Sequence, residues 1–204
     1  MKTYYLNTPL KDEDIAKLEA GDTVYLSGKL YTARDMAHYK LKKLLESNRK
    51  FDEDLNGQAI FHAGPITSVN RESGEYKVIS IGPTSSIRMD PYTDMVGEMG
   101  VKVLIGKGGM SDSTTEAMKK HTMVYLLAAH GCAAVHTQRI TKVTHQYWMD
   151  EIGMPEAMWV MECDNFGPLI VGIDSKGRNL FEETRKNSKD MIEAISKQTS
   201  CKSK

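Results

Sequence analysis

The 204-residue sequence has no long hydrophobic run, no excess of either charge and little cysteine. No apolar stretch approaches the ~18–20 residues that span a bilayer, so we expect neither a membrane helix nor a membrane partner. The first residues lack the apolar core of a secretory signal peptide, which predicts a cytoplasmic location. Lys plus Arg and Asp plus Glu both number 27, and this balance argues against nucleic-acid binding, which usually needs a basic face.

The cysteines are too few and too dispersed for the common cysteine-based sites. Cys132, Cys163 and Cys201 form no C-x-x-C pair, so we expect neither a structural zinc site nor a disulfide framework. Three cysteines could hold a cluster across a fold, and this alternative stays open. We favour ordinary free thiols, because free cysteine usually behaves as a small buried residue.

The sequence does contain alternating strand-like and helix-like segments, with 40% hydrophobic residues. We expect one domain over residues 1–198, followed by a disordered tail over 199–204. Strands are predicted over 3–6, 23–27, 59–62, 76–81, 101–105, 133–136, 157–162 and 169–173. Helices are predicted over 12–18, 33–46, 113–130 and 182–197, with capping-box patterns beginning at Thr32 and Ser113. Consecutive strands near 59–81 and 157–173 indicate an α/β fold with a mixed sheet.

Three cations lie at turns where strands end and helices begin. Arg34 falls in the first turn of a predicted helix, where the helix dipole disfavours a cation by ~0.3–1 kcal/mol. Arg88 and Lys107 each follow a predicted strand, and Lys107 lies in the glycine-rich segment IGKGGM. Ligands of α/β proteins bind at such strand ends, and the free N–H groups of helix N-termini attract anions. The three cations would suit an anionic ligand, and a dicarboxylate could use all of them.

Each cation also has a simpler interpretation. Arg34 could form a solvated ion pair with Asp35, and Arg88 could pair with Asp90 on the surface. Lys107 is harder to explain in this way, because glycine is costly unless the backbone needs a positive φ or a close approach to a ligand. The segment lacks the G-x-x-x-x-G-K-[ST] order of a P-loop, which argues against a nucleotide hydrolase.

Other polar residues near these turns show no metal-site pattern. The hydroxyl groups of Thr84, Ser85 and Ser86 could cap the following helix or face a ligand, and both interpretations stay open. The six histidines have no metal-ligand spacing. We expect His38 and His62, the two nearest the candidate turns, to be packing residues.

Six segments occur in an order that resembles one known family. They are LYTARDMAH (30–38), IFHAGP (60–65), GPTSSIRM (82–89), GKGGM (106–110), GMPEAMW (153–159) and FGPLIV (166–171). Each segment is weak evidence alone, but the ordered series resembles the β subunit of class I iron–sulfur fumarate hydratases and L-tartrate dehydratases. The resemblance covers residues 1 to about 185.

The resemblance implies a three-layer, swivelling β/β/α domain that closes over a site shared with a separate α subunit. In that family the α subunit holds a [4Fe-4S] cluster through three cysteines, so the cofactor is expected on the partner. By resemblance, Arg34, Arg88 and Lys107 bind substrate oxygens, and Thr84 is the proton-transfer group. The implied catalytic residues are therefore Thr84, Arg88 and Lys107.

The resemblance also implies the reaction. The first expectation is the β subunit of a hydro-lyase that hydrates fumarate to L-malate reversibly. The alternative is the β subunit of L-tartrate dehydratase, which converts tartrate to oxaloacetate, because both substrates are four-carbon dicarboxylates. A non-catalytic dicarboxylate-binding module is the third possibility. Threonine is a poor base at its ordinary pKa, and no activating group adjoins Thr84 in the sequence, so we expect the partner to supply one.

Overall fold

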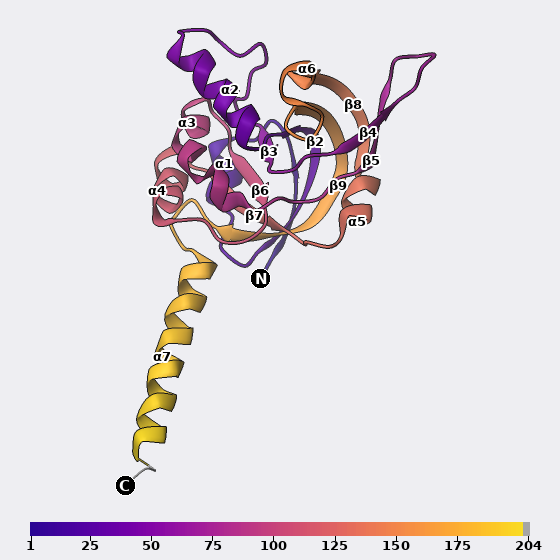
Figure 1. Ribbon diagram of the computed structural model, residues 1–204. Coiled ribbons are helices and arrows are strands. Elements are labelled where there is room, and N and C mark those ends of the chain that lie inside the picture. The colour runs from indigo at the N-terminus through magenta and orange to yellow at the C-terminus, as the bar shows by residue number, and fades with distance from the viewer. Residues whose placement is uncertain (202–204) are drawn as a thin grey trace.

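A computed structural model describes residues 1–201 and contains a seven-stranded mixed sheet, which confirms the α/β class (Figure 1). Its strands, in spatial order, are β1 (Thr3–Asn7), β2 (Thr23–Thr32), β3 (Ala59–Phe61), β6 (Val103–Gly106), β7 (Val124–Ala128), β9 (Met158–Ile173) and β8 (Ile140–Tyr147). Neighbours from β1 to β7 are parallel, whereas β9 is antiparallel to β2, β7 and β8. Because β9 pairs with both β2 and β7, the strands β2, β3, β6, β7 and β9 form a closed circuit of pairings.

The chain also contains helices and a separate antiparallel hairpin. The helices are α1 (Asp12–Ala16), α2 (Asp35–Glu46), α3 (Thr93–Glu98), α4 (Asp112–His121), α5 (Ala133–Gln138), α6 (Met149–Ile152), α7 (Leu180–Cys201) and the 3-10 helix η1 (Ser86–Tyr92). The hairpin is β4 (Ile66–Val69) with β5 (Tyr76–Ser80). Helices α2, α3 and α4 gather on one side of the sheet, and α7 extends away from it (Figure 1). Within residues 1–201, none of the helices is long and apolar enough to cross a membrane.

Two buried clusters divide the strand residues between them, because successive side chains of a strand point to opposite faces. Phe61 and Leu126 belong to one cluster, together with Trp159 of β9. Their neighbours Ile60 and Tyr125 belong to the other, which includes residues of α2, α3 and α4. The central strands are therefore buried on both faces, which explains why they read as nearly continuous apolar runs.

The helix predicted over 113–130 is wrong in its second half. Helix α4 ends at His121, Thr122 adopts the left-handed conformation (φ 51°), and residues 124–128 form β7. Pairing of this apolar segment between β6 and β9 overrides its helical pattern. The capping box predicted from Ser113 is also wrong, because the N-cap is Ser111 and no side chain caps the helix.

Three further strand predictions need correction. Residues 133–136 lie in α5 rather than in a strand. The segments 157–162 and 169–173 are parts of the single strand β9, and the turn expected near Asn165 is an irregularity in its pairing with β2. The edge strand β8 is not predicted from the sequence, because its mostly exposed polar residues do not alternate with apolar ones.

The C-terminal helix predicted over 182–197 is α7, which continues to Cys201 and so enters the segment predicted as a tail. Residues 202–204 of that segment lie outside the described residues. The domain boundary at residue 198 stays a prediction.

Candidate functional site

The four residues singled out by sequence lie on segments that meet at one edge of the large sheet. Arg34 follows β2, Lys107 follows β6, and β3 lies between these two strands. Thr84 and Arg88 lie on the segment that leads from β5 into η1. This segment returns to the same edge, because the backbone N–H of Thr84 donates to the carbonyl of His62, directly after β3, at 2.7 Å.

The turns carrying Thr84 and Lys107 are joined by their backbones. The N–H of Lys107 donates to the carbonyl of Thr84 at 3.3 Å, and the N–H of Ser86 donates to the carbonyl of Lys107 at 3.1 Å. The Lys107 turn has a second anchor, because the Tyr125 hydroxyl donates to the carbonyl of Gly108 at 2.9 Å. Gly108 has φ +79°, a conformation that glycine adopts without strain. The two turns therefore form one unit.

Arg34 is the N-cap residue of α2, one position before the helix, and no cap from its own side chain is present. Its Nη2 atom lies 3.1 Å from the Oε1 atom of Glu156. The solvated Arg34–Asp35 pair considered from the sequence is wrong, because Asp35 pairs with Arg88 instead. The capping box beginning at Thr32 is wrong too, since the Thr32 hydroxyl accepts a hydrogen bond from the backbone of Trp159 at 3.0 Å.

Arg88 connects the Thr84 turn to α2. Its Nη2 atom donates to the Thr84 hydroxyl at 2.9 Å and lies 3.2 Å from the Asp35 carboxylate. The alternative pair with Asp90 is wrong. Burial tends to raise the pKa of Asp90, but hydrogen bonds from Ser111 and other residues outweigh it and hold that pKa below its usual range.

A buried polar pair lies beneath these turns. The Nδ1 atom of His62 and the Oγ atom of Ser86 share a hydrogen bond of 2.8 Å. A Cβ atom at Gly106 would overlap the Ser86 hydroxyl, so glycine is required where β6 ends. His38 lies nearby, with its ring 5.5 Å from that of His62 and its Nδ1 atom 2.8 Å from the carbonyl of Arg34. The predicted packing histidines are thus both buried, and both contact the backbone or side chains of the candidate turns.

Burial keeps both histidines neutral near pH 7. It lowers the pKa of His38 to about 4, although hydrogen bonding to Arg34 opposes the shift. It lowers the pKa of His62 well below the usual range, and the neighbouring His38 adds to the effect. Neither ring therefore adds positive charge to the three cations at neutral pH.

Sequence reasoning missed Glu156, and it named Asp35 and Ser86 without predicting the contacts that they make. Asp35 pairs with Arg88 and Glu156 with Arg34, whereas Ser86 bonds His62 through its hydroxyl and the carbonyl of Lys107 through its backbone N–H. Glu156 stands in the segment GMPEAMW and Ser86 in GPTSSIRM, so the motifs contained both. Their contacts could not be predicted from the motifs, because they join segments that are far apart in the sequence.

Within residues 1–201, no group of three or more His, Cys, Asp and Glu side chains is arranged to hold a metal ion. Burial raises the pKa of the Cys163 thiol to about 12, so it is protonated at neutral pH and a poor metal ligand. Its sulfur lies 3.4 Å and 3.5 Å from two backbone carbonyls of β2. The described residues therefore do not fit an iron–sulfur cluster held by this chain alone.

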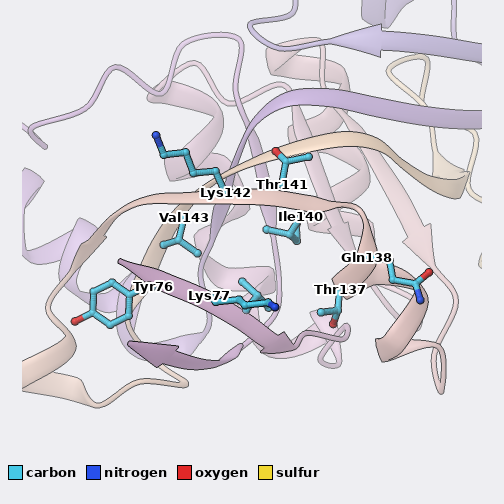
Figure 2. A pocket seen from close by; sticks show the side chains of 9 residues that line it. Tyr76, Lys77, Thr137, Gln138, Ile140, Thr141, Lys142 and Val143 are labelled. Atoms are coloured by element: carbon cyan, nitrogen blue, oxygen red, sulfur yellow. The ribbon is translucent and has the colours of Figure 1, made fainter. Parts of the chain in front are cut away.

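A cavity of about 400 Å³ lies elsewhere, between β5, α5 and β8 (Figure 2). In Figure 2, Ile140 and Val143 of β8 point toward β5, whereas Thr141 and Lys142 point away. None of the four candidate residues lines this cavity. At the candidate site, Arg88 keeps 43% of its side chain exposed and Arg34 keeps 25%.

Comparison with known proteins identifies relatives along most of the chain. The family model described as Fumarase C-terminus matches residues 1–184. An Escherichia coli (strain K12) protein named L(+)-tartrate dehydratase subunit beta is 41% identical over 182 residues, which cover 89% of this chain and 88% of that protein. A Methanocaldococcus jannaschii protein named "Putative L(+)-tartrate dehydratase subunit beta" is 43% identical over 183 residues, with 89% and 93% coverage.

A third relative is a longer protein. The Geobacillus stearothermophilus protein named "Putative fumarate hydratase class I" is 38% identical over 188 residues, which cover 92% of this chain but 35% of that protein. The conserved unit thus occurs both in separate subunits and as part of a longer chain. The match over residues 1–184 and the identity to these relatives show that the chain belongs to the Fumarase C-terminus family.

Proposed function

We propose that this chain is the β subunit of a two-subunit hydro-lyase that acts on a four-carbon dicarboxylate. The observation that carries the proposal is the assembly of Arg34, Arg88 and Lys107 with Thr84 at one edge of the sheet. The relatives named as hydro-lyases support the reaction class. The name "subunit beta" supports an α partner.

The proposed chemistry uses these residue types directly. Adding or removing water beside a carboxylate moves a proton on and off the adjacent carbon, and negative charge then builds on that carboxylate. Preorganised cations stabilise such charge most strongly where water is excluded. Arg88 and Lys107 are proposed to provide this stabilisation, and Arg34 to bind the second carboxylate.

Thr84 is the proposed proton-transfer group. Its hydroxyl accepts a hydrogen bond from Arg88 at 2.9 Å, and a charged donor in this position favours the deprotonated oxygen. Part of the activation expected from the partner subunit can therefore come from this chain. Asp35 shares the same Arg88 nitrogen and limits how far that group can move.

The charges at the site also support a partner. The three cations lie with two carboxylates, Asp35 and Glu156, which leaves one net positive charge against the two negative charges of a dicarboxylate. We propose that the α subunit supplies the remaining compensation through its own side chains and also holds a [4Fe-4S] cluster. When bound, the cluster would act as a Lewis acid toward the hydroxyl group that is transferred.

The finer features of fold and location are part of the same proposal. Helices α2, α3 and α4 on one side of the parallel strands, with β9 and β8 on the other, support a three-layer swivelling β/β/α domain (Figure 1). We propose a cytoplasmic enzyme without nucleic-acid or membrane partners.

Fumarate is the first proposed substrate and tartrate the second. One observation favours tartrate: the two relatives that align along most of their own length are both named as L(+)-tartrate dehydratase β subunits. The test is anaerobic co-expression with the α subunit, followed by assays of fumarate hydration and tartrate dehydration. We expect a brown complex active on one of them, whereas the isolated chain should be colourless and inactive. Iron–sulfur absorbance in the isolated chain, or a loaded complex inactive on both substrates, would overturn the proposal.

A further inference from the structure

The segment GMPEAMW contains Glu156, which lies in the connection between α6 and β9. We propose that Glu156 is a positioning residue that orients Arg34 for the substrate carboxylate. The inference rests on the proposed function and assigns a role to a residue that does not itself touch substrate.

The carboxylate of Glu156 makes two contacts with the start of α2. Its Oε1 atom lies 3.1 Å from Nη2 of Arg34, and its Oε2 atom accepts a hydrogen bond from the backbone N–H of Met36 at 3.1 Å. The side chains of Glu156 and Arg34 are 21% and 25% exposed. At this burial the pair is screened less than a surface ion pair.

The contacts solve two local problems at the helix start. An N-cap is usually a short polar side chain that accepts a helix N–H, but Arg34 has no such group. A cation at this position is also repelled by the helix dipole. Glu156 supplies both the missing acceptor and a compensating negative charge from a residue distant in the sequence.

The loop that carries Glu156 is held firmly in place. A Cβ atom at Gly64 would collide with the carbonyl of Pro155 and lie 2.9 Å from Nη1 of Arg34, so glycine lets both approach. The indole of Trp159 donates to the carbonyl of Met154 at 2.9 Å. The backbone of the loop is therefore held in place, and this limits the positions that the Glu156 carboxylate can take.

Glu156 uses only part of the guanidinium. The Nε atom of Arg34 is buried and has no hydrogen-bond partner among the described residues. Glu156 thus restrains one end of the guanidinium through Nη2 without occupying every donor. A guanidinium held in one plane can present paired N–H groups to a carboxylate.

The test compares Glu156→Gln with wild type in the complete complex. Glutamine keeps an oxygen that can accept from Met36 but removes the charge that holds Arg34. We expect KM to rise on the order of tenfold, as for loss of a charge-assisted contact, with kcat nearly unchanged and the complex still folded. In an Arg34→Ala background, Glu156→Gln should have no further effect on KM, because Glu156 acts through Arg34.

The matched control is Glu151→Gln. Glu151 lies on α6 and pairs with Lys40 of α2, outside the candidate site, so its loss should leave KM and kcat unchanged. Normal KM in an active Glu156→Gln complex would overturn the inference alone, as would an equal KM increase in the Arg34→Ala background. A loaded wild-type complex inactive on both dicarboxylates would overturn the proposed function, and this inference with it.

Discussion

Arg88 is the residue on which most contacts of the candidate site converge. One of its nitrogens lies near both the Thr84 hydroxyl and the Asp35 carboxylate, so a single side chain links η1, the preceding turn and α2. A lysine could not reproduce this geometry, because an ammonium group is a point charge without the planar fork of a guanidinium. Replacement of Arg88 should therefore affect both substrate binding and the state of Thr84.

The first prediction concerns variants of this arginine in the reconstituted complex. Arg88→Ala should lower kcat by about 10²–10³-fold, the usual loss when one preorganised donor is removed. Arg88→Lys should also lose most of the activity. The control is Arg71→Ala, in the exposed turn between β4 and β5, which should retain wild-type kinetics. Steady-state assays with cluster content checked first would settle the point, and normal kcat/KM in both Arg88 variants would remove Arg88 from the site.

The buried histidines give a prediction for stability against pH. Burial lowers the pKa of His38 in the folded chain from 6.5 to about 4. Between pH 6.5 and pH 4, His38 is therefore protonated in the unfolded chain but neutral in the folded chain. The free energy of unfolding should be highest above pH 6.5 and should fall toward pH 4, by up to about 1.4 kcal/mol per pH unit for each such histidine.

His38→Asn tests this directly, because asparagine can still bond the carbonyl of Arg34 but does not titrate. Urea unfolding of wild type and variant at several pH values gives the two slopes. We expect a shallower fall for the variant between pH 6.5 and 4, whatever its stability at pH 7. Identical slopes would mean that His38 is protonated in the folded chain.

At the residue scale, the sequence predicted the cations of the candidate site but not the carboxylates that pair with them. Arg34 and Lys107 follow parallel strands, whose carboxyl ends meet at one edge of the sheet. Arg88 follows the antiparallel hairpin instead, and the backbone hydrogen bonds of the Thr84 turn bring it to the same edge. Their partners could not be predicted, since Glu156 reaches Arg34 only through the folding of β9 beside β2. The roles of the four residues in catalysis stay predictions.

Among the elements, the end of β6 has the tightest packing requirement of the site. The hydroxyl of Ser86 occupies the place where a Cβ atom on Gly106 would lie, and it bonds His62 in that position. The strand end and η1 can approach each other only because residue 106 has no side chain. This contact couples the Lys107 turn to the Thr84 turn.

Gly106→Ala should destabilise the chain by about 1–3 kcal/mol, the usual cost of overpacking. Adding Ser86→Ala removes the overlapping oxygen, so the double variant should be more stable than Gly106→Ala alone. Gly82→Ala is the control, because a Cβ atom there would meet Ala133 at an ordinary 3.4 Å. Chemical denaturation of the four proteins measures these differences. A Gly106→Ala variant as stable as wild type would show that the strand end and η1 are not in contact.

At the element scale, local pattern was reliable where strands and helices had clear ends. The strand over 76–81 and the helix over 33–46 were placed within two residues of β5 and α2. Prediction failed where pairing decides the structure. Residues 124–128 continue a helical apolar pattern, but they form a strand buried between two others. The segment near Asn165 has the sequence of a turn, yet β9 continues through it because a bulge in the pairing with β2 accommodates the extra residue.

For the whole molecule, the important feature is that this chain alone does not fully shield the candidate site from water. Arg88 is partly exposed, and none of the four candidate residues lines the cavity between β5 and β8. Electrostatic stabilisation by cations is weak in water and strong where water is excluded. The proposed activity therefore requires a partner to cover this edge of the sheet, which agrees with the separate-subunit relatives.

The most direct test of the central claim is a titration of purified, cluster-loaded α subunit with this chain under anaerobic conditions. Wild-type chain should give saturable activity on fumarate or tartrate. Lys107→Ala should bind the α subunit with the same stoichiometry but lower kcat by about 10²–10³-fold, because a preorganised cation is lost. Lys107→Arg should also be impaired, because a planar guanidinium on a longer side chain does not place its charge where the compact ammonium group lies. Full activity with Lys107→Ala, or full activity of the α subunit alone, would contradict the account.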